Sequence, residues 1–143
     1  MNNRTLKFRV WDIDGKIWIN VDDIIIDGDG ILWIRDWIND CVTRKGNFVI
    51  QQFTGLLDKN NKEIFEGDIV TFQQNSSCHG KYGNETGIVK SSKYGEWIIE
   101  NLNKNRWPKE TIFDNLFTCK KSEREEEVII GNIFQNPELL ATA

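Results

Sequence analysis

The sequence predicts a mainly β fold, built as a short-stranded curved sheet or a small barrel with at most two short helices. Short segments in which apolar and polar residues alternate predict strands, and clusters of Asp, Asn and Gly between them predict turns. The chain also holds six Trp, eight Phe and two Tyr among 143 residues. Large aromatic side chains favour strands over helices, so the composition supports the same fold class.

A hairpin is predicted at the N-terminal end. Apolar and basic residues alternate over residues 6–10, and residues 17–21 form the partner strand. Asp14 and Gly15 lie between them, and an Asp-Gly pair favours a tight hairpin turn because Gly accepts a positive φ without steric cost.

A second hairpin is predicted immediately afterwards. Its strands are residues 24–26 and 31–34, which flank an Asp-Gly-Asp-Gly turn. Residues 36–45 are expected to form a short helix or an irregular segment. Residues 47–53 return to a strand pattern.

The middle of the chain is expected to alternate turns with strands. Residues 54–70 are rich in Asp, Asn and Gly, which predicts turns before a strand over 69–72. The polar stretch 73–83 predicts a loop. Residues 86–90 and 97–100 predict two further strands.

The C-terminal part is expected to contain one short helix and one strand. Apolar residues at helical spacing follow Pro108, which predicts a helix over 108–118. A charged connector over 120–127 then leads to a last strand over 128–134.

The length predicts a single domain over residues 1–143. Within it, residues 1–53 are expected to form the hairpins and residues 54–143 a small-barrel part. No apolar run approaches the roughly 20 residues that a membrane-spanning helix needs, and the N-terminus lacks a secretory apolar core. We therefore expect a cytoplasmic protein with no membrane partner.

Cysteine spacing gives no metal-site pattern. Cys41, Cys78 and Cys119 are widely separated, and the one histidine is His79. A zinc site would need three distant segments to converge, so free thiols in a reducing compartment are the simpler interpretation. No cofactor or metal ion is expected.

An enzymatic function stays uncertain and is not the expected one. Glu63, Glu66 and Asp68 are close enough in sequence to consider for acid–base or metal chemistry. Their turn-rich surroundings explain these residues without catalysis, so no catalytic residue is assigned.

The middle of the chain is the only candidate for a basic face. The whole chain has a net charge of −4, whereas residues 73–121 carry eight basic and five acidic side chains. Cations interleaved with aromatic rings bind single-stranded nucleic acid in small barrels. The candidate residues for this function are Lys90, Lys93, Trp97, Lys104, Arg106 and Trp107. The opposing interpretation, which we favour, is a half-buried sheet whose aromatics face the core and whose lysines face solvent.

Three segments resemble the YopX-like phage and prophage proteins. Residues 52–70, QFTGLLDKNNKEIFEGDIV, resemble the central motif of that family, residues 6–12, LKFRVWD, its opening, and residues 128–140, VIIGNIFQNPELL, its close. Asn61 stands where the family commonly has Gly, and Asn is the next-best residue for a left-handed turn position. Val10 replaces a smaller Ala.

The resemblance implies a phage or prophage gene product, made in a bacterial host cell, with a mostly β fold. It implies no catalytic residues. Residues 66–70 followed by 87–90 also resemble the turn-then-strand rhythm of SH3-like barrels, an analogy of topology that carries no function.

The expected function is therefore that of a phage-encoded accessory protein that binds a host or phage protein without catalysis. The aromatic surplus also fits a homo-oligomer, because unpaired strand edges and exposed Trp favour assembly. Binding of single-stranded nucleic acid is the alternative.

Overall fold

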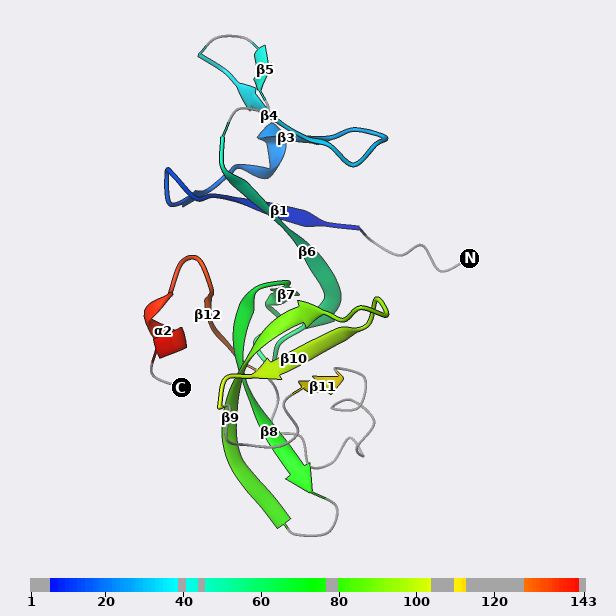
Figure 1. The fold of residues 1–143 in the computed structure, drawn as a ribbon, viewed down its shortest axis with the longest axis vertical. Coiled ribbons are helices and arrows are strands. Elements are labelled where there is room, and N and C mark those ends of the chain that lie inside the picture. Colours follow the sequence, from blue (N-terminus) through cyan, green and yellow to red (C-terminus); the bar gives the residue numbers. More distant parts are fainter. Residues whose placement is uncertain are drawn as a thin grey trace. The chain divides into compact units, whose positions relative to one another are not determined.

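The computed structural model describes residues 6–38, 41–43, 46–76, 80–103, 110–112 and 128–141, and hydrogen-bonded strands form most of these residues. The prediction of a mainly β fold is confirmed (Figure 1). In chain order the elements are β1 (Phe8–Asp12), β2 (Ile17–Trp18), the 3₁₀ turn η1 (Val21–Asp23), β3 (Ile24–Ile26), β4 (Leu32–Asp36), β5 (Cys41–Thr43), β6 (Phe48–Leu57), β7 (Glu63–Phe65), β8 (Asp68–Ser76), β9 (Gly80–Ser91), β10 (Trp97–Asn101), β11 (Glu110–Ile112), β12 (Val128–Asn132) and α2 (Glu138–Ala141).

The described residues divide into two compact units. The N-terminal unit is Leu6–Gln52, and the C-terminal unit extends from Phe53 to the end of α2. The division falls within β6, whose first half pairs with β1 and whose second half pairs with β7.

The N-terminal unit begins with the predicted hairpin, β1–β2. The Asp12 carboxylate accepts the backbone N–H groups of Asp14 and Gly15, each at 3.0 Å, so the Asp side chain stabilises the turn. Trp11 and Trp18 lie opposite one another and meet edge to face, with ring centroids 4.9 Å apart. The first strand then pairs with β6.

The second predicted hairpin, β3–β4, is also present, and β5 adds a third strand to it. The short helix considered for 36–45 does not fit, because Cys41–Thr43 pairs with β4. Val42 and Thr43 are β-branched, which favours strand pairing at the edge that β4 offers.

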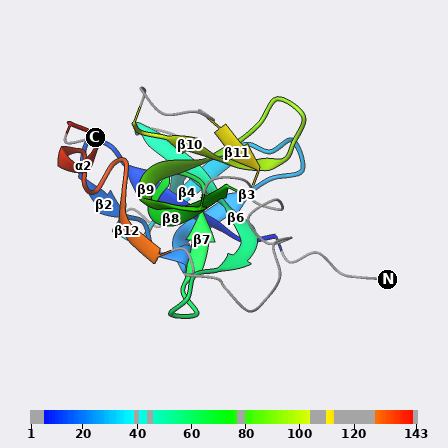
Figure 2. The same ribbon diagram turned by 90° about the horizontal axis from the view of Figure 1, so that it is seen from below.

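The C-terminal unit is built on a curled antiparallel sheet in the order β11-β10-β9-β8-β12 (Figure 2). One face of this sheet carries the core. It consists of five buried apolar side chains that interdigitate from β7, β8, β9 and β10: Ile64, Val70, Phe72, Val89 and Ile99.

Gly87 lies where the sheet packs most tightly. A Cβ atom at this position would lie 2.3 Å from Cγ2 of Ile99 and 2.8 Å from the backbone oxygen of Glu100. Because Gly87 has no side chain, Ile99 and the backbone of β10 can pack directly against this point of β9.

Three segments predicted as turns, loop or helix contain strands. The turns predicted over 54–70 are interrupted by the end of β6 and by β7. The loop predicted over 73–83 is wrong at both ends, because β8 runs to Ser76 and β9 begins at Gly80.

The helix predicted over 108–118 is wrong at Glu110–Ile112, which pairs with β10; residues 108–109 and 113–118 lie outside the described residues. In all three places backbone pairing to a neighbouring strand overrides the side-chain pattern.

The turn after β6 depends on Asp58. Its Oδ1 accepts the N–H groups of Asn60 and Lys62, and its Oδ2 accepts that of Ile129, at 3.3 Å. Burial acts to raise the pKa of Asp58, but these backbone N–H groups outweigh it and lower the pKa below the ordinary value of 3.8. Asn61 has a φ of +61° in this turn, as its place in the motif predicted.

The turn before β8 depends on Asp68, which is almost fully buried. Its Oδ2 accepts the N–H of Phe65, and its Oδ1 accepts the side-chain amide of Asn132, at 3.2 Å. Asp58 and Asp68 thus join the central motif to β12, so these carboxylates serve architecture.

Candidate functional site

The six residues predicted for nucleic-acid binding are only partly described. Lys104, Arg106 and Trp107 lie outside the described residues. Lys90 lies next to the last residue of β9 and forms an ion pair with Glu100 on β10. Trp97 begins β10, is half-buried, and packs against the core of the C-terminal unit.

Two predicted lysines line a hollow of about 700 Å³ at the β9–β10 turn. The lining combines charged and apolar groups, because two lysines and two glutamates lie around it together with the apolar side chain of Ile98. The lining consists of Lys90, Ser91, Ser92, Lys93, Tyr94, Glu96, Ile98 and Glu100. The Ser92 hydroxyl accepts the N–H groups of Tyr94 and Glu96, each at 3.2 Å, and so shapes the turn.

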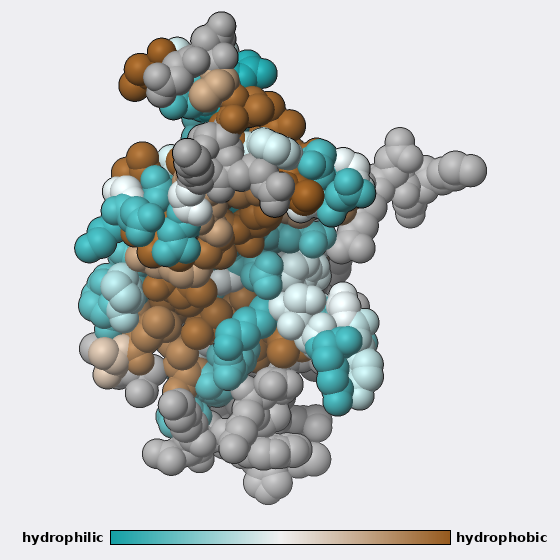
Figure 3. Space-filling model, turned by 45° about the horizontal axis from the view of Figure 1, so that its top comes forward, coloured by the Kyte–Doolittle hydropathy of each residue, from teal (hydrophilic) through white to brown (hydrophobic). Residues whose placement is uncertain are grey.

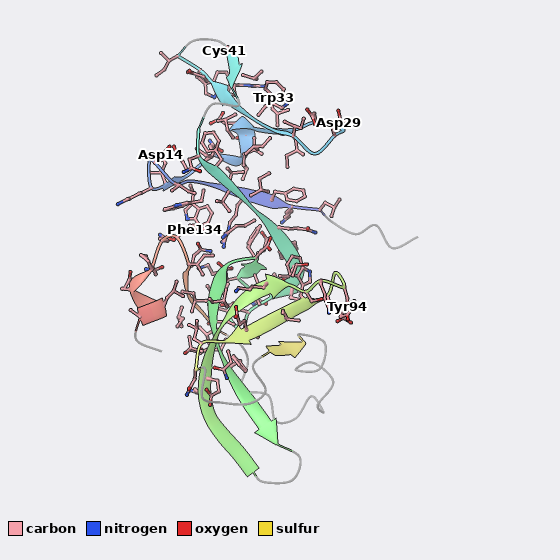
Figure 4. All side chains as sticks on the ribbon, viewed as in Figure 1. Asp14, Asp29, Trp33, Cys41, Tyr94 and Phe134 are labelled. Carbon is pink, nitrogen blue, oxygen red and sulfur yellow. The ribbon has the colours of Figure 1, made fainter. Side chains whose placement is uncertain are left out.

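Tyr94 is the aromatic residue in the lining of this hollow, and its ring is accessible to solvent. Its side chain is 77% exposed at the turn, and the Lys93 ammonium lies 4.9 Å from the ring centroid (Figure 4). The hollow could therefore receive one flat or anionic group, although its two carboxylates oppose a polyanion.

A second surface lies in the N-terminal unit, on one face of the sheet β3-β4-β5. We call it the aromatic face, and it consists of Ile25, Trp33, Arg35, Trp37 and Val42. Ile25 lies opposite Trp33, and Arg35 lies opposite Val42, so these four share one side of the sheet. Trp37 follows β4, and the Arg35 guanidinium lies 4.8 Å from its ring centroid.

The outer part of the aromatic face is open to solvent. Arg35 and Val42 are exposed, and Trp37 is 64% exposed. Ile38, next in the chain, is also exposed. Figure 3 shows hydrophobic residues, coloured brown, at the surface among hydrophilic ones.

Carboxylates hold both indoles of the aromatic face. Trp33 Nε1 donates to Oδ2 of Asp27 at 2.9 Å, and Trp37 Nε1 donates to Oδ1 of Asp23. Asp27 is itself fixed, because its Oδ1 accepts the N–H groups of Asp29 and Ile31. Rings held in this way lose little conformational entropy on binding.

Sequence reasoning did not identify the aromatic face, because residues 36–45 were expected to be helical or irregular. A signal was available in the spacing of tryptophan and aspartate. Trp33 and Trp37 follow four aspartates between residues 22 and 29. A half-buried Trp usually donates its indole N–H to a hydrogen-bond acceptor, and a carboxylate nearby in the chain can be that acceptor.

Within the described part of the chain, no group of three or more His, Cys, Asp or Glu side chains is arranged to hold a metal ion. Cys41 is exposed with a free thiol. Cys78, His79 and Cys119 lie outside the described residues. No helix among the described residues is both long and apolar enough to cross a membrane.

Comparison with known proteins identifies the family. The family model described as YopX protein matches residues 7–141. A crystal structure of protein EF1440 from Enterococcus faecalis is similar in fold, with a TM-score of 0.60 and 24% sequence identity over 95% of this chain and 98% of that chain. No functionally curated protein matches this chain significantly.

Proposed function

Since this chain belongs to the YopX protein family, we propose that it acts as a phage-encoded accessory protein that binds another protein without catalysis. The observation that carries the proposal is the aromatic face. Its exposed Trp37 is stacked by Arg35 and held by Asp23. Trp and Arg are the residues that most often dominate the binding energy of protein interfaces.

The aromatic face also contributes little to a buried core. Of the described apolar residues in β3, β4 and β5, only Ile34 is buried, with 8% of its surface exposed. Its neighbours on β4, Trp33 and Arg35, lie on the opposite side of the sheet. Large exposed apolar groups that gather at one place usually mark an interaction site.

The test is co-purification of the tagged full chain from the cells that produce it naturally. We expect a stoichiometric protein partner that Trp37→Ala loses. Tyr94→Ala is the matched control, because Tyr94 is an equally exposed ring in the C-terminal unit, and it should retain the partner. A partner retained by Trp37→Ala would falsify the assignment of the aromatic face.

Self-association is a specific form of this proposal. Sizing with light scattering would then give a dimer or larger assembly that Trp37→Ala dissociates. A monomer at high concentration argues for a different protein as the partner.

The second candidate is binding of single-stranded nucleic acid at the β9–β10 hollow. The observation that favours it is the exposed Tyr94 ring beside the Lys93 ammonium, a stacking platform with an adjacent cation. Retention on a single-stranded oligonucleotide should then fall steeply with salt and be lost in Tyr94→Ala. Absence of retention at low salt contradicts it.

A further inference from the structure

We propose that the protein segment bound by the aromatic face is basic, with lysine or arginine side chains flanking an apolar anchor. This inference rests on the proposed function and adds the chemistry of the partner. It follows from the charges that surround the aromatic face rather than from the rings themselves.

Acidic side chains are concentrated around the aromatic face. The described residues of this segment, 21–38 and 41–43, carry five aspartates and one arginine, a net charge of −4, and the entire chain also has a net charge of −4. A surface of one sign attracts the opposite sign and repels its own.

The structure places two of these carboxylates on the indoles of the aromatic face. Asp23 and Asp27 each bind an indole N–H of that face, through one oxygen each. Asp22 and Asp29 are exposed beside them, and Figure 4 shows Asp29 at the end of the hairpin that carries Trp33.

The one cation on the aromatic face is already engaged. Arg35 lies over the Trp37 ring, and one exposed cation does not offset the aspartates around the face. A cation from the partner would meet Asp22, Asp23 or Asp29 at the rim. Its apolar anchor would pack on Trp37 and Val42, the exposed apolar members of the face.

The alternative, an acidic segment, is disfavoured by the same geometry. It would bring like charges together at the rim, and among the described residues of the face only Arg35 would serve as a counter-charge. Like-charge contacts across an interface oppose association, and they do so most strongly at low ionic strength.

The test is selection of short random peptides on the immobilised full chain, with counter-selection on Trp37→Ala. Peptides that require Trp37 should be rich in Lys and Arg around an aromatic or aliphatic residue. Affinity of a selected synthetic peptide, followed by fluorescence anisotropy, should fall as salt rises.

Charge reversal provides the matched comparison. The pair Asp22→Lys with Asp29→Lys should weaken binding of the selected peptide by about tenfold. The pair Asp14→Lys with Glu138→Lys makes the same change in net charge at two exposed positions outside residues 21–43, in the β1–β2 turn and in α2, and should leave binding nearly unchanged.

The outcomes separate the two proposals. Peptides that require Trp37 but are neutral or acidic, or that tolerate Asp22→Lys with Asp29→Lys, overturn the basic partner and leave protein binding in place. If no selected peptide requires Trp37, and Trp37→Ala instead dissociates a dimer, the partner is a second copy and the inference is wrong. If neither peptide nor dimer depends on Trp37, the proposed function fails as well.

Discussion

The two units use aromatic and carboxylate side chains in opposite ways. In the C-terminal unit, Phe72 is buried in the core and Asp68 is buried against β12. In the N-terminal unit, Trp37 and its partner Asp23 remain accessible on the aromatic face. The same residue types therefore stabilise the fold in one unit and form a candidate binding surface in the other. Substitutions that remove side chains should separate these two uses.

The largest difference is expected between Ile99→Ala and Trp37→Ala. Ile99 is fully buried in the core of the C-terminal unit, so its truncation should lower the free energy of unfolding by about 2–5 kcal/mol. Trp37 is mostly exposed, and its loss should cost less than about 1 kcal/mol. Denaturant titration of both variants measures the difference; equal losses would contradict the division of roles.

A smaller effect is expected from adding a methyl group at two glycines. Gly87→Ala inserts a Cβ atom against Ile99 and the backbone of Glu100, and should cost about 1–3 kcal/mol. Gly28→Ala, in the β3–β4 turn, has no atom within 4 Å of the new Cβ and should be nearly neutral. Melting temperatures compare the two variants, and a neutral Gly87→Ala would show that β9 and β10 pack less closely than described.

A pH-dependent effect is expected from Asp58. Its pKa is lowered in the folded state, so the ionised carboxylate stabilises the fold above the ordinary, unfolded-state pKa of 3.8. This contribution is lost as pH falls through the folded pKa. Asp58→Asn should be less stable by about 1–2 kcal/mol at neutral pH, and the difference should shrink in acid.

The control for Asp58→Asn is Asp14→Asn, in an exposed hairpin turn. It should change the stability little at any pH. A difference between Asp58→Asn and the unmodified chain that stays constant from neutral pH to pH 3 would contradict the account of the Asp58 pKa.

The smallest effect is expected from the ion pair of Lys90 and Glu100. Both side chains are substantially exposed, so Lys90→Met should change the free energy of unfolding by less than about 1 kcal/mol. The change should diminish further at high salt. A large loss that persists at high salt would indicate that Lys90 supports the β9–β10 hairpin through packing instead.

The elements predicted well are those set by local chemistry. The first turn lies where the Asp-Gly pair predicted it, although the positive φ is at Lys16 and not at Gly15, and the Asp12 carboxylate stabilises it. Asn61 adopts the left-handed conformation expected of it. Such turns depend on a few adjacent residues, and sequence alone specifies those. The motif 52–70 likewise indicated the family before any comparison.

The elements predicted poorly depend on distant partners. Nothing in the polar residues 73–76 indicates a strand, because their pairing follows from the register that β8 shares with β9. The segment Glu110–Ile112 is similarly determined by β10. The aromatic face escaped prediction for the same reason, since it needs the register of Arg35 with Val42.

Hydrogen exchange of the full chain, with and without its captured partner, tests the central claim most directly. We predict slower amide exchange over residues 32–43, in and around β4 and β5, when the partner is bound, with exchange over residues 88–100 unchanged. Protection over residues 88–100 instead, with none over 32–43, would contradict the account and place the binding surface at the β9–β10 hollow.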